Sequence, residues 1–207
     1  MKNATNLIKY KIWAPIYDPI MGNRLFRRAR KRAFSLLGFQ AGQKMLLVGV
    51  GTGEDLNYIP VEVDIIGIDL SLDMLKKAMK KARSTSIELI PMNAEELAFP
   101  DCSFDVVALS LILSVVENPA KAMSEAVRVL KPGGQILVFD KFESNKGKTN
   151  YYRRLFNLLT SLAGTDITRR FEDISLGLNL KTLKKEDSIM SGSYKIILLE
   201  KGVRHKL

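Results

Sequence analysis

The chain has 207 residues, of which 46% are apolar and 26% charged, a balance typical of one globular domain with a buried core. Its single cysteine, Cys102, excludes an internal disulfide, and its single histidine, His205, argues against a Cys/His metal centre or a Ser-His-Asp triad. The net charge is +10. No apolar run is long enough to cross a bilayer, and the first twenty residues lack the apolar segment of a secretory signal, so we expect a cytoplasmic protein.

An amphipathic, strongly basic helix is expected over residues 23–37, with Gly38 as its stop. The residues expected on its apolar side are Leu25, Phe26, Ala29, Ala33, Leu36 and Leu37. The remaining positions carry Arg24, Arg27, Arg28, Arg30, Lys31 and Arg32.

Short apolar runs and helical patterns then alternate through residues 44–140. The runs expected to form strands are 44–49, 63–69, 87–91, 104–109 and 135–140. The segments expected to form helices are 72–83, capped by Ser71 and with Leu72, Leu75, Met79 and Ala82 on one face, and 119–130. This alternation predicts an α/β fold, a doubly wound and mostly parallel sheet covered on both faces.

The last part of the chain is expected to add an inserted helix over 151–162 and a late strand over 194–200, antiparallel at the edge of the sheet or next to it. We therefore expect a single domain, 1–207. Residues 1–43 form a basic N-terminal cap, 44–140 the core, and 141–207 the inserted helix and final strands.

The most informative stretch is Val48–Gly53, Val-Gly-Val-Gly-Thr-Gly, which follows a predicted strand. Glycines at this point let the backbone approach a ligand closely and direct N–H groups toward it. Asp69 ends the next strand, where a carboxylate can accept hydrogen bonds from both hydroxyls of a ribose. The combination predicts a nucleoside site at the carboxyl ends of the first two strands.

The spacing G-x-G-x-G is tighter than the dinucleotide fingerprint, and here the sequence resembles the class I S-adenosylmethionine-dependent methyltransferases. Five segments carry the resemblance in order: Val48–Gly53; Ile68–Ser71 with Met74; Asn93–Glu95; Phe99–Asp101 with Phe104 and Asp105; and Leu130–Gly134. The resemblance implies a seven-stranded, Rossmann-like methyltransferase fold with S-adenosylmethionine as cofactor and no metal.

The same resemblance implies which residues hold the cofactor. The glycine turn would face its methionine part, Asp69 its ribose, and the neighbouring segments its adenine and the sides of the molecule. The expected cofactor residues are Gly49, Val50, Gly51, Gly53, Asp69, Leu70, Met74, Asn93, Ala94, Glu95, Leu109 and Ser110.

Two positions depart from the family pattern. Leu47 stands where an acid is usual, two residues before the first glycine, and Asn93 stands where aspartate is usual. Loss of the acid should weaken the hold on the methionine ammonium, whereas Asn93 can still hydrogen-bond the adenine amine.

The N-terminal segment resembles the start of bacterial soluble phosphatidylethanolamine N-methyltransferases, through Trp13-Ala14-Pro15-x-Tyr17-Asp18-x-x-x-Gly22, and more distantly the ubiquinone/menaquinone C-methyltransferases. The resemblance favours methyl transfer to the amine of phosphatidylethanolamine or a related aminophospholipid. Tyr17 is the residue expected nearest the transferring methyl. The expected substrate-binding residues are Tyr10, Trp13, Arg24, Arg28 and Tyr152.

Charge is unevenly distributed along the chain. Residues 1–43 carry nine Lys/Arg against one acid, 44–140 nine against fourteen, and 141–207 fourteen against seven. Basic flanks favour an anionic membrane surface or phospholipid headgroup as partner, with the protein peripheral on the inner face of the cell membrane. Three alternatives remain: RNA methylation, methylation of a small aromatic or quinone precursor, and a binding module that has lost turnover.

Overall fold

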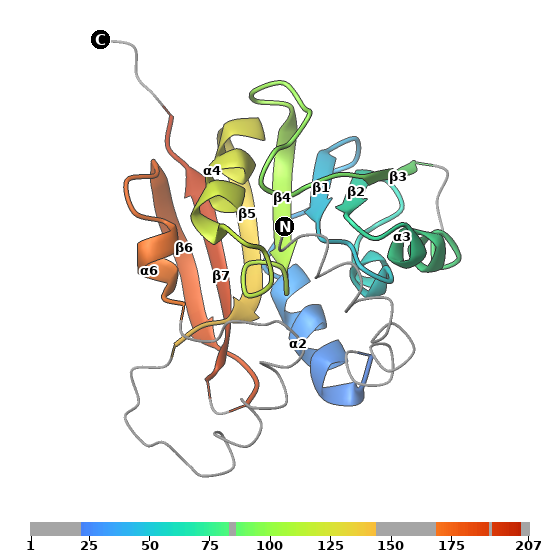
Figure 1. The fold of residues 1–207 in the computed structure, drawn as a ribbon, viewed down its shortest axis with the longest axis horizontal. Helices are drawn as coiled ribbons and strands as arrows, with labels where there is room; N and C mark the ends of the chain where they lie inside the picture. Colours follow the sequence, from blue (N-terminus) through green and yellow to red (C-terminus); the bar gives the residue numbers. More distant parts are fainter. Residues whose placement is uncertain (1–21, 83–85, 144–168, 191, 204–207) are drawn as a thin grey trace.

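The computed structural model describes residues 22–82, 86–143, 169–190 and 192–203, and these build one seven-stranded sheet with the strand order β3-β2-β1-β4-β5-β7-β6 (Figure 1). The strands are β1 (Lys44–Val48), β2 (Asp64–Asp69), β3 (Ile87–Pro91), β4 (Phe104–Ser110), β5 (Leu130–Lys141), β6 (Leu180–Asp187) and β7 (Tyr194–Lys201). The first five strands pair in parallel, whereas β7 is antiparallel to both β5 and β6. The expected doubly wound, mostly parallel, seven-stranded fold is thus confirmed.

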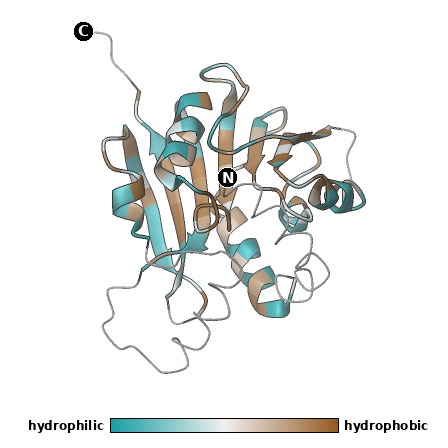
Figure 2. Ribbon diagram, in the orientation of Figure 1, coloured by the Kyte–Doolittle hydropathy of each residue, from teal (hydrophilic) through white to brown (hydrophobic). Residues whose placement is uncertain are grey.

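Helices cover both faces of this sheet. One face packs against α4 (Pro119–Val129) and the short α6 (Phe171–Ile174). The other packs against α2 (Arg24–Phe34), the 3-10 turn η1 (Glu54–Tyr58) and α3 (Leu72–Met79). Figure 2 shows the consequence in the strands: the central ones are predominantly hydrophobic, while the edge strand β6 is largely hydrophilic.

The ends of the helices follow their sequence signals. Asn23 caps α2 by accepting hydrogen bonds from the backbone N–H groups of Leu25 and Phe26, and Ser71 caps α3 by accepting one from Met74. Pro119 stands in the first turn of α4, where its missing N–H costs no helical bond.

The predicted apolar faces of the two helices on the η1 side need correction. Leu25 is 47% exposed, Leu72 60% and Met79 54%, although the helical periodicity assigned all three to the core. In their place α2 buries Phe34 and α3 buries Met74 and Ala78. Ala78 packs against Gly53, where an added Cβ atom would come within 2.9 Å of the Ala78 Cα atom. The buried face of α3 is thus the one that makes this tertiary contact.

Other boundaries also differ from expectation. Helix α3 ends at Met79 rather than residue 83, and β5 begins at Leu130, before the Lys-Pro-Gly-Gly segment. The seventh strand, which the sequence did not locate, is β6, whereas the late strand is β7 and lies next to the edge as expected. The inserted helix over 151–162 and the N-terminal part of the cap lie outside the described residues.

Candidate active site

The glycine turn lies between β1 and η1, at the carboxyl end of β1. Gly49, Gly51 and Gly53 have φ angles of +73°, +55° and +81°, the left-handed region that favours glycine. A Cβ atom at Gly49 would come within 2.8 Å of the Ile112 side chain. The turn is therefore glycine-dependent both in conformation and in space.

Asp69 closes this turn from the neighbouring strand. One carboxylate oxygen accepts a hydrogen bond from the Gly51 N–H group at 2.9 Å, and the other accepts one from the Ser71 N–H group at 2.9 Å. Burial raises the pKa of Asp69, against the lowering effect of these two hydrogen bonds. Because a carboxylate offers about four acceptor positions, two remain for the hydroxyls of a ribose.

The segments after β2 and β3 lie beside Asp69. The Met92 N–H group donates to the Asp69 carbonyl at 3.1 Å, which brings the end of β3 next to the end of β2. Leu70 is partly exposed, and Met74, in the first turn of α3, is buried. This arrangement brings the residues expected around the adenine to one edge of the sheet.

The Asn93–Glu95 segment is ordered by its own polar groups. The Asn93 side-chain oxygen accepts from the Glu95 N–H group at 3.0 Å, and Ala94 is buried. Glu95 accepts from the N–H groups of Glu117 and Asn118, at 2.8 and 3.1 Å. The side chain of Glu95 thus fastens this segment to the loop before α4, a structural role that the sequence did not indicate.

The two expected residues at the end of β4 differ in their surroundings. The Leu109 side chain is fully buried in the core beneath α4, so a cofactor contact by Leu109 stays a prediction. Ser110 is also buried, but its Oγ atom has no hydrogen-bond partner, the one such side-chain atom among the residues described. A buried hydroxyl without a partner is costly unless a ligand supplies one, so Ser110 fits a binding role.

A second buried acid, Asp140, stands near the carboxyl end of β5, and sequence reasoning did not propose it for the site. Its carboxylate accepts from the N–H groups of Ser114 at 3.1 Å and Lys141 at 2.7 Å. Burial raises its pKa, whereas burial lowers the pKa of the neighbouring Lys141. The available signal was an acid ending an apolar strand, but its contact with the loop after β4 is visible only in the fold.

That loop begins in an unusual conformation. Leu111, the first residue after β4, has a φ angle of +57°, which is uncommon for a residue other than glycine. Ile112 reaches the glycine turn, and Asp140 holds Ser114 from the other side. The loop therefore connects the cofactor side of the site to the end of β5.

The family position two residues before the first glycine is apolar in the structure as well. Leu47 is buried in the layer that contains Phe26 and Leu137, on the α2 side of the sheet. β1 thus offers no carboxylate to a methionine ammonium at this position, and weaker cofactor binding stays a prediction.

The expected substrate residues are only partly described. Arg24 and Arg28 are exposed on α2, whereas Tyr10, Trp13, Tyr17 and Tyr152 lie outside the described residues. Arg30, expected on the solvated side of α2, is instead buried and donates from its Nε atom to Asp55 of η1 at 2.8 Å.

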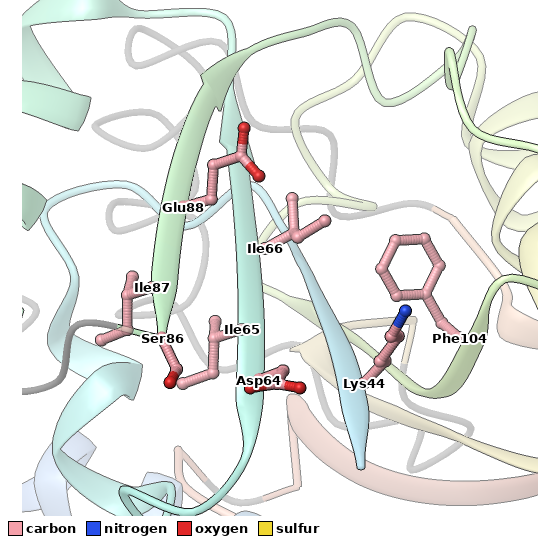
Figure 3. A pocket seen from close by; sticks show the side chains of 8 residues that line it. All are labelled: Lys44, Asp64, Ile65, Ile66, Ser86, Ile87, Glu88 and Phe104. Carbon is pink, nitrogen blue, oxygen red and sulfur yellow. The ribbon is translucent and has the colours of Figure 1, made fainter. Parts of the chain in front are cut away.

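A surface pocket of about 310 Å³ lies elsewhere, at the amino ends of β1 to β4 (Figure 3). Its lining includes the polar side chains of Lys44, Asp64 and Glu88 and the ring of Phe104. Ligands of open α/β sheets bind at the carboxyl ends of the strands, so this pocket is not the candidate active site. Among the residues described, no group of three His, Cys, Asp or Glu side chains could hold a metal ion.

The chain is similar to known methyltransferases. Residues 46–138 match the family described as "Methyltransferase domain". The chain is 37% identical over 142 residues to a phosphatidylethanolamine N-methyltransferase from Cereibacter sphaeroides, covering 67% of this chain and 68% of that one. It is 31% identical over 182 residues to a demethylmenaquinone methyltransferase from Renibacterium salmoninarum, covering 85% and 76%.

The fold is also shared with solved structures. A geranyl diphosphate methyltransferase in complex with S-adenosylmethionine superposes with a TM-score of 0.70 at 15% identity, covering 87% of this chain and 86% of that chain. At this identity the likeness shows the fold alone.

The fold, the glycine turn and the two relatives together define the class: the chain belongs to the class I S-adenosylmethionine-dependent methyltransferases. It is a methyltransferase, and S-adenosylmethionine is its cofactor. The residues present fit that cofactor, because the left-handed glycine turn leaves room for a close approach and Ser110 has a buried hydroxyl without a partner.

Proposed function

We propose that the protein transfers a methyl group to the amine of phosphatidylethanolamine or a related aminophospholipid. The observation that carries the proposal is the 37% identity to a phosphatidylethanolamine N-methyltransferase over two thirds of each chain. The exposed Arg24 and Arg28 of α2 support it, because both can attract the phosphate of a headgroup. We further propose that the protein works in the cytoplasm, at the inner face of the cell membrane.

The proposal assigns cofactor contacts to the residues at the carboxyl edge. Asp69 would accept from the ribose hydroxyls, and the N–H groups of the glycine turn would meet the methionine part. Leu70 and Met74 would flank the adenine, with Asn93 at its edge. The support for these roles is the hydrogen bond between Asp69 and Gly51, which ties the ribose acid to the turn.

When bound, S-adenosylmethionine supplies an electrophilic methyl group on a sulfonium. The chain has to hold the acceptor nitrogen in line with that methyl and to exclude water. It also has to bind the amine in its deprotonated form, because only that form has a lone pair to attack the methyl carbon. With Asp69 of β2 holding the ribose and the glycine turn after β1 holding the methionine part, the cofactor would lie across the ends of β2, β1 and β4, and the acceptor would lie beside the ends of β4 and β5. Tyr17 remains our candidate for the residue nearest the methyl.

A second candidate is methylation of a quinone-type ring. The demethylmenaquinone methyltransferase relative aligns with a larger share of this chain, 85%, although at lower identity. The acceptor atom would then be a carbon, and the basic helix would bind only an acidic group of the substrate.

Methyl-labelled S-adenosylmethionine separates the candidates. The purified protein is incubated in parallel with phosphatidylethanolamine in detergent micelles, with demethylmenaquinone in the same micelles, and with total RNA. The proposal expects label on phosphatidylethanolamine, and an Asp69→Ala variant as control should transfer far less. Label on demethylmenaquinone or RNA, with none on phosphatidylethanolamine, would refute it.

A further inference from the structure

Two basic helices cover the same face of the sheet. Helix α2 carries six Arg/Lys and no acid. Helix α3 and the two residues after it carry Lys76, Lys77, Lys80 and Lys81 against the single acid Asp73. Arg30 is buried, so the exposed charges are those of the other five Arg/Lys of α2 and of Lys76 and Lys80. Both helices pack on one face of the sheet, so these charges lie on the same side of it, although α3 belongs to the segment that is acidic along the sequence.

The turn η1 joins the two helices. Asp55 forms a buried ion pair with Arg30 of α2, with 2.8 Å between the Nε and Oδ1 atoms, and the adjacent Glu54 pairs with Lys81 after α3. Both acids follow the glycine turn directly. The two helices are therefore fixed relative to each other and to the cofactor side of the site.

The outer sides of both helices also carry large apolar side chains. Leu25 of α2, and Leu72 and Met79 of α3, are about half exposed or more. Each has an arginine or lysine next to it or one helical turn away, such as Arg24 beside Leu25 and Lys76 between Leu72 and Met79. Basic side chains alone would be enough to bind the phosphate groups of a nucleic acid. Basic and apolar side chains together are typical of a surface that binds at the headgroup boundary of a lipid bilayer.

The helices on the opposite face of the sheet carry fewer basic residues. Helix α4 has Lys121 and Arg128 against Glu125, and α6 has the acids Glu172 and Asp173. One large apolar side chain, Leu176 directly after α6, is 83% exposed. In the described structure the excess of basic residues on helices thus belongs to the face covered by α2 and α3.

We propose that the outer surfaces of α2 and α3 together form the docking surface for an anionic phospholipid bilayer, with Leu25, Leu72 and Met79 entering the headgroup boundary. The inference rests on the proposed function in so far as the acceptor is a lipid. It adds α3 as a docking element of equal standing with α2.

The test measures co-sedimentation with vesicles of phosphatidylcholine alone and of equal parts of phosphatidylcholine and phosphatidylglycerol. The charge variant is Lys76→Glu with Lys80→Glu, and the apolar variant is Leu72→Gln with Met79→Gln. The matched control is Lys121→Glu with Lys184→Glu. It makes the same change of charge on α4 and β6, at two lysines whose side chains are exposed. Cofactor binding by calorimetry verifies that every variant is folded.

The wild-type protein should bind the anionic vesicles and not the neutral ones. The charge variant should lose at least about tenfold in partition coefficient, the apolar variant should lose severalfold, and the control should stay within about twofold of the wild type. Equal losses in the control and the charge variant would overturn the inference. It would also be overturned if both α3 variants bound the vesicles as tightly as the wild-type protein does, or if the wild-type protein bound single-stranded RNA more tightly than vesicles. Transfer to phosphatidylethanolamine in micelles, measured on the same proteins, reports separately on the proposed function.

Discussion

At the residue scale, the proposed ribose contact of Asp69 should make the affinity for the cofactor depend on pH. Burial raises its pKa, so the carboxylate takes up a proton at a higher pH than an exposed aspartate would. Ribose hydroxyls donate to the ionised form, so affinity should be constant near neutral pH and fall as the pH drops through the raised pKa. Titration calorimetry of S-adenosylmethionine across this range measures the effect. Asp69→Asn should bind more weakly and without this pH dependence, and a flat wild-type profile would contradict the assignment.

Gly53 is the turn residue least tolerant of a side chain. Its φ angle is +81°, and a Cβ atom would press on the backbone of Ala78. Gly42 is the matched control, because its φ angle is +76° with open space around it. Gly42→Ala should cost about 1–2 kcal/mol of unfolding free energy, and Gly53→Ala distinctly more, with loss of cofactor affinity. Equal effects of the two substitutions in urea unfolding would show that the contact with Ala78 can relax.

The site residues differ in how far the sequence could predict them. Asp69 and the glycines could be proposed from the sequence because the chemistry demands one residue type at a fixed distance along the chain, and the hydrogen bond between Asp69 and Gly51 brings them together in the structure. The contact between Asp140 and Ser114 depends on the pairing of β4 with β5, which brings together residues 26 positions apart. The isolated Ser110 hydroxyl is likewise a property of the packed structure.

At the element scale, the loop after β4 depends on Asp140. In Asp140→Asn one of the two backbone N–H groups would face an amide donor instead of a carboxylate oxygen. The loop should loosen on the acceptor side of the site, so turnover should fall by at least about tenfold while cofactor affinity changes little. Steady-state kinetics combined with calorimetry measure both. A loss confined to cofactor affinity would contradict this division of the site.

The ion pair between Arg30 and Asp55 should stabilise the contact between α2 and η1. Both side chains are buried, so Arg30→Met leaves the Asp55 carboxylate without this partner and should cost about 3–5 kcal/mol of unfolding free energy. The double variant Arg30→Met with Asp55→Leu should recover much of the loss, because no buried charge remains. Urea unfolding of the three proteins gives the comparison, and an additive loss in the double variant would contradict it.

Elements were predictable where burial imposes a pattern. The central strands were located because both of their faces are covered, which requires continuous apolar runs. Strand β6 is mostly exposed at the edge of the sheet and carries Lys181, Lys184 and Lys185, so it shows no alternation that would reveal it. The prediction of which face of α3 is buried was wrong. The helix turns Ala78 toward Gly53, and this close contact is not visible in the helical periodicity of the sequence.

At the scale of the whole molecule, the candidate cofactor site and the basic helices lie on neighbouring parts of the sheet. The candidate cofactor site lies at the carboxyl edge of the sheet, and the basic helices α2 and α3 cover one of its faces and are joined through η1. Among the residues described, no helix is long and apolar enough to cross a bilayer. The segmental charge pattern predicted an anionic partner but not this face, because the lysines of α3 stand in the acidic part of the sequence.

The most direct test of the account is methyl transfer from labelled S-adenosylmethionine to phosphatidylethanolamine presented in vesicles with and without phosphatidylglycerol. We predict that label enters phosphatidylethanolamine, that the rate rises with the share of anionic lipid, and that added salt lowers it by screening the basic face. Label that reaches phosphatidylethanolamine in neither kind of vesicle nor in micelles would contradict the central claim of an aminophospholipid acceptor.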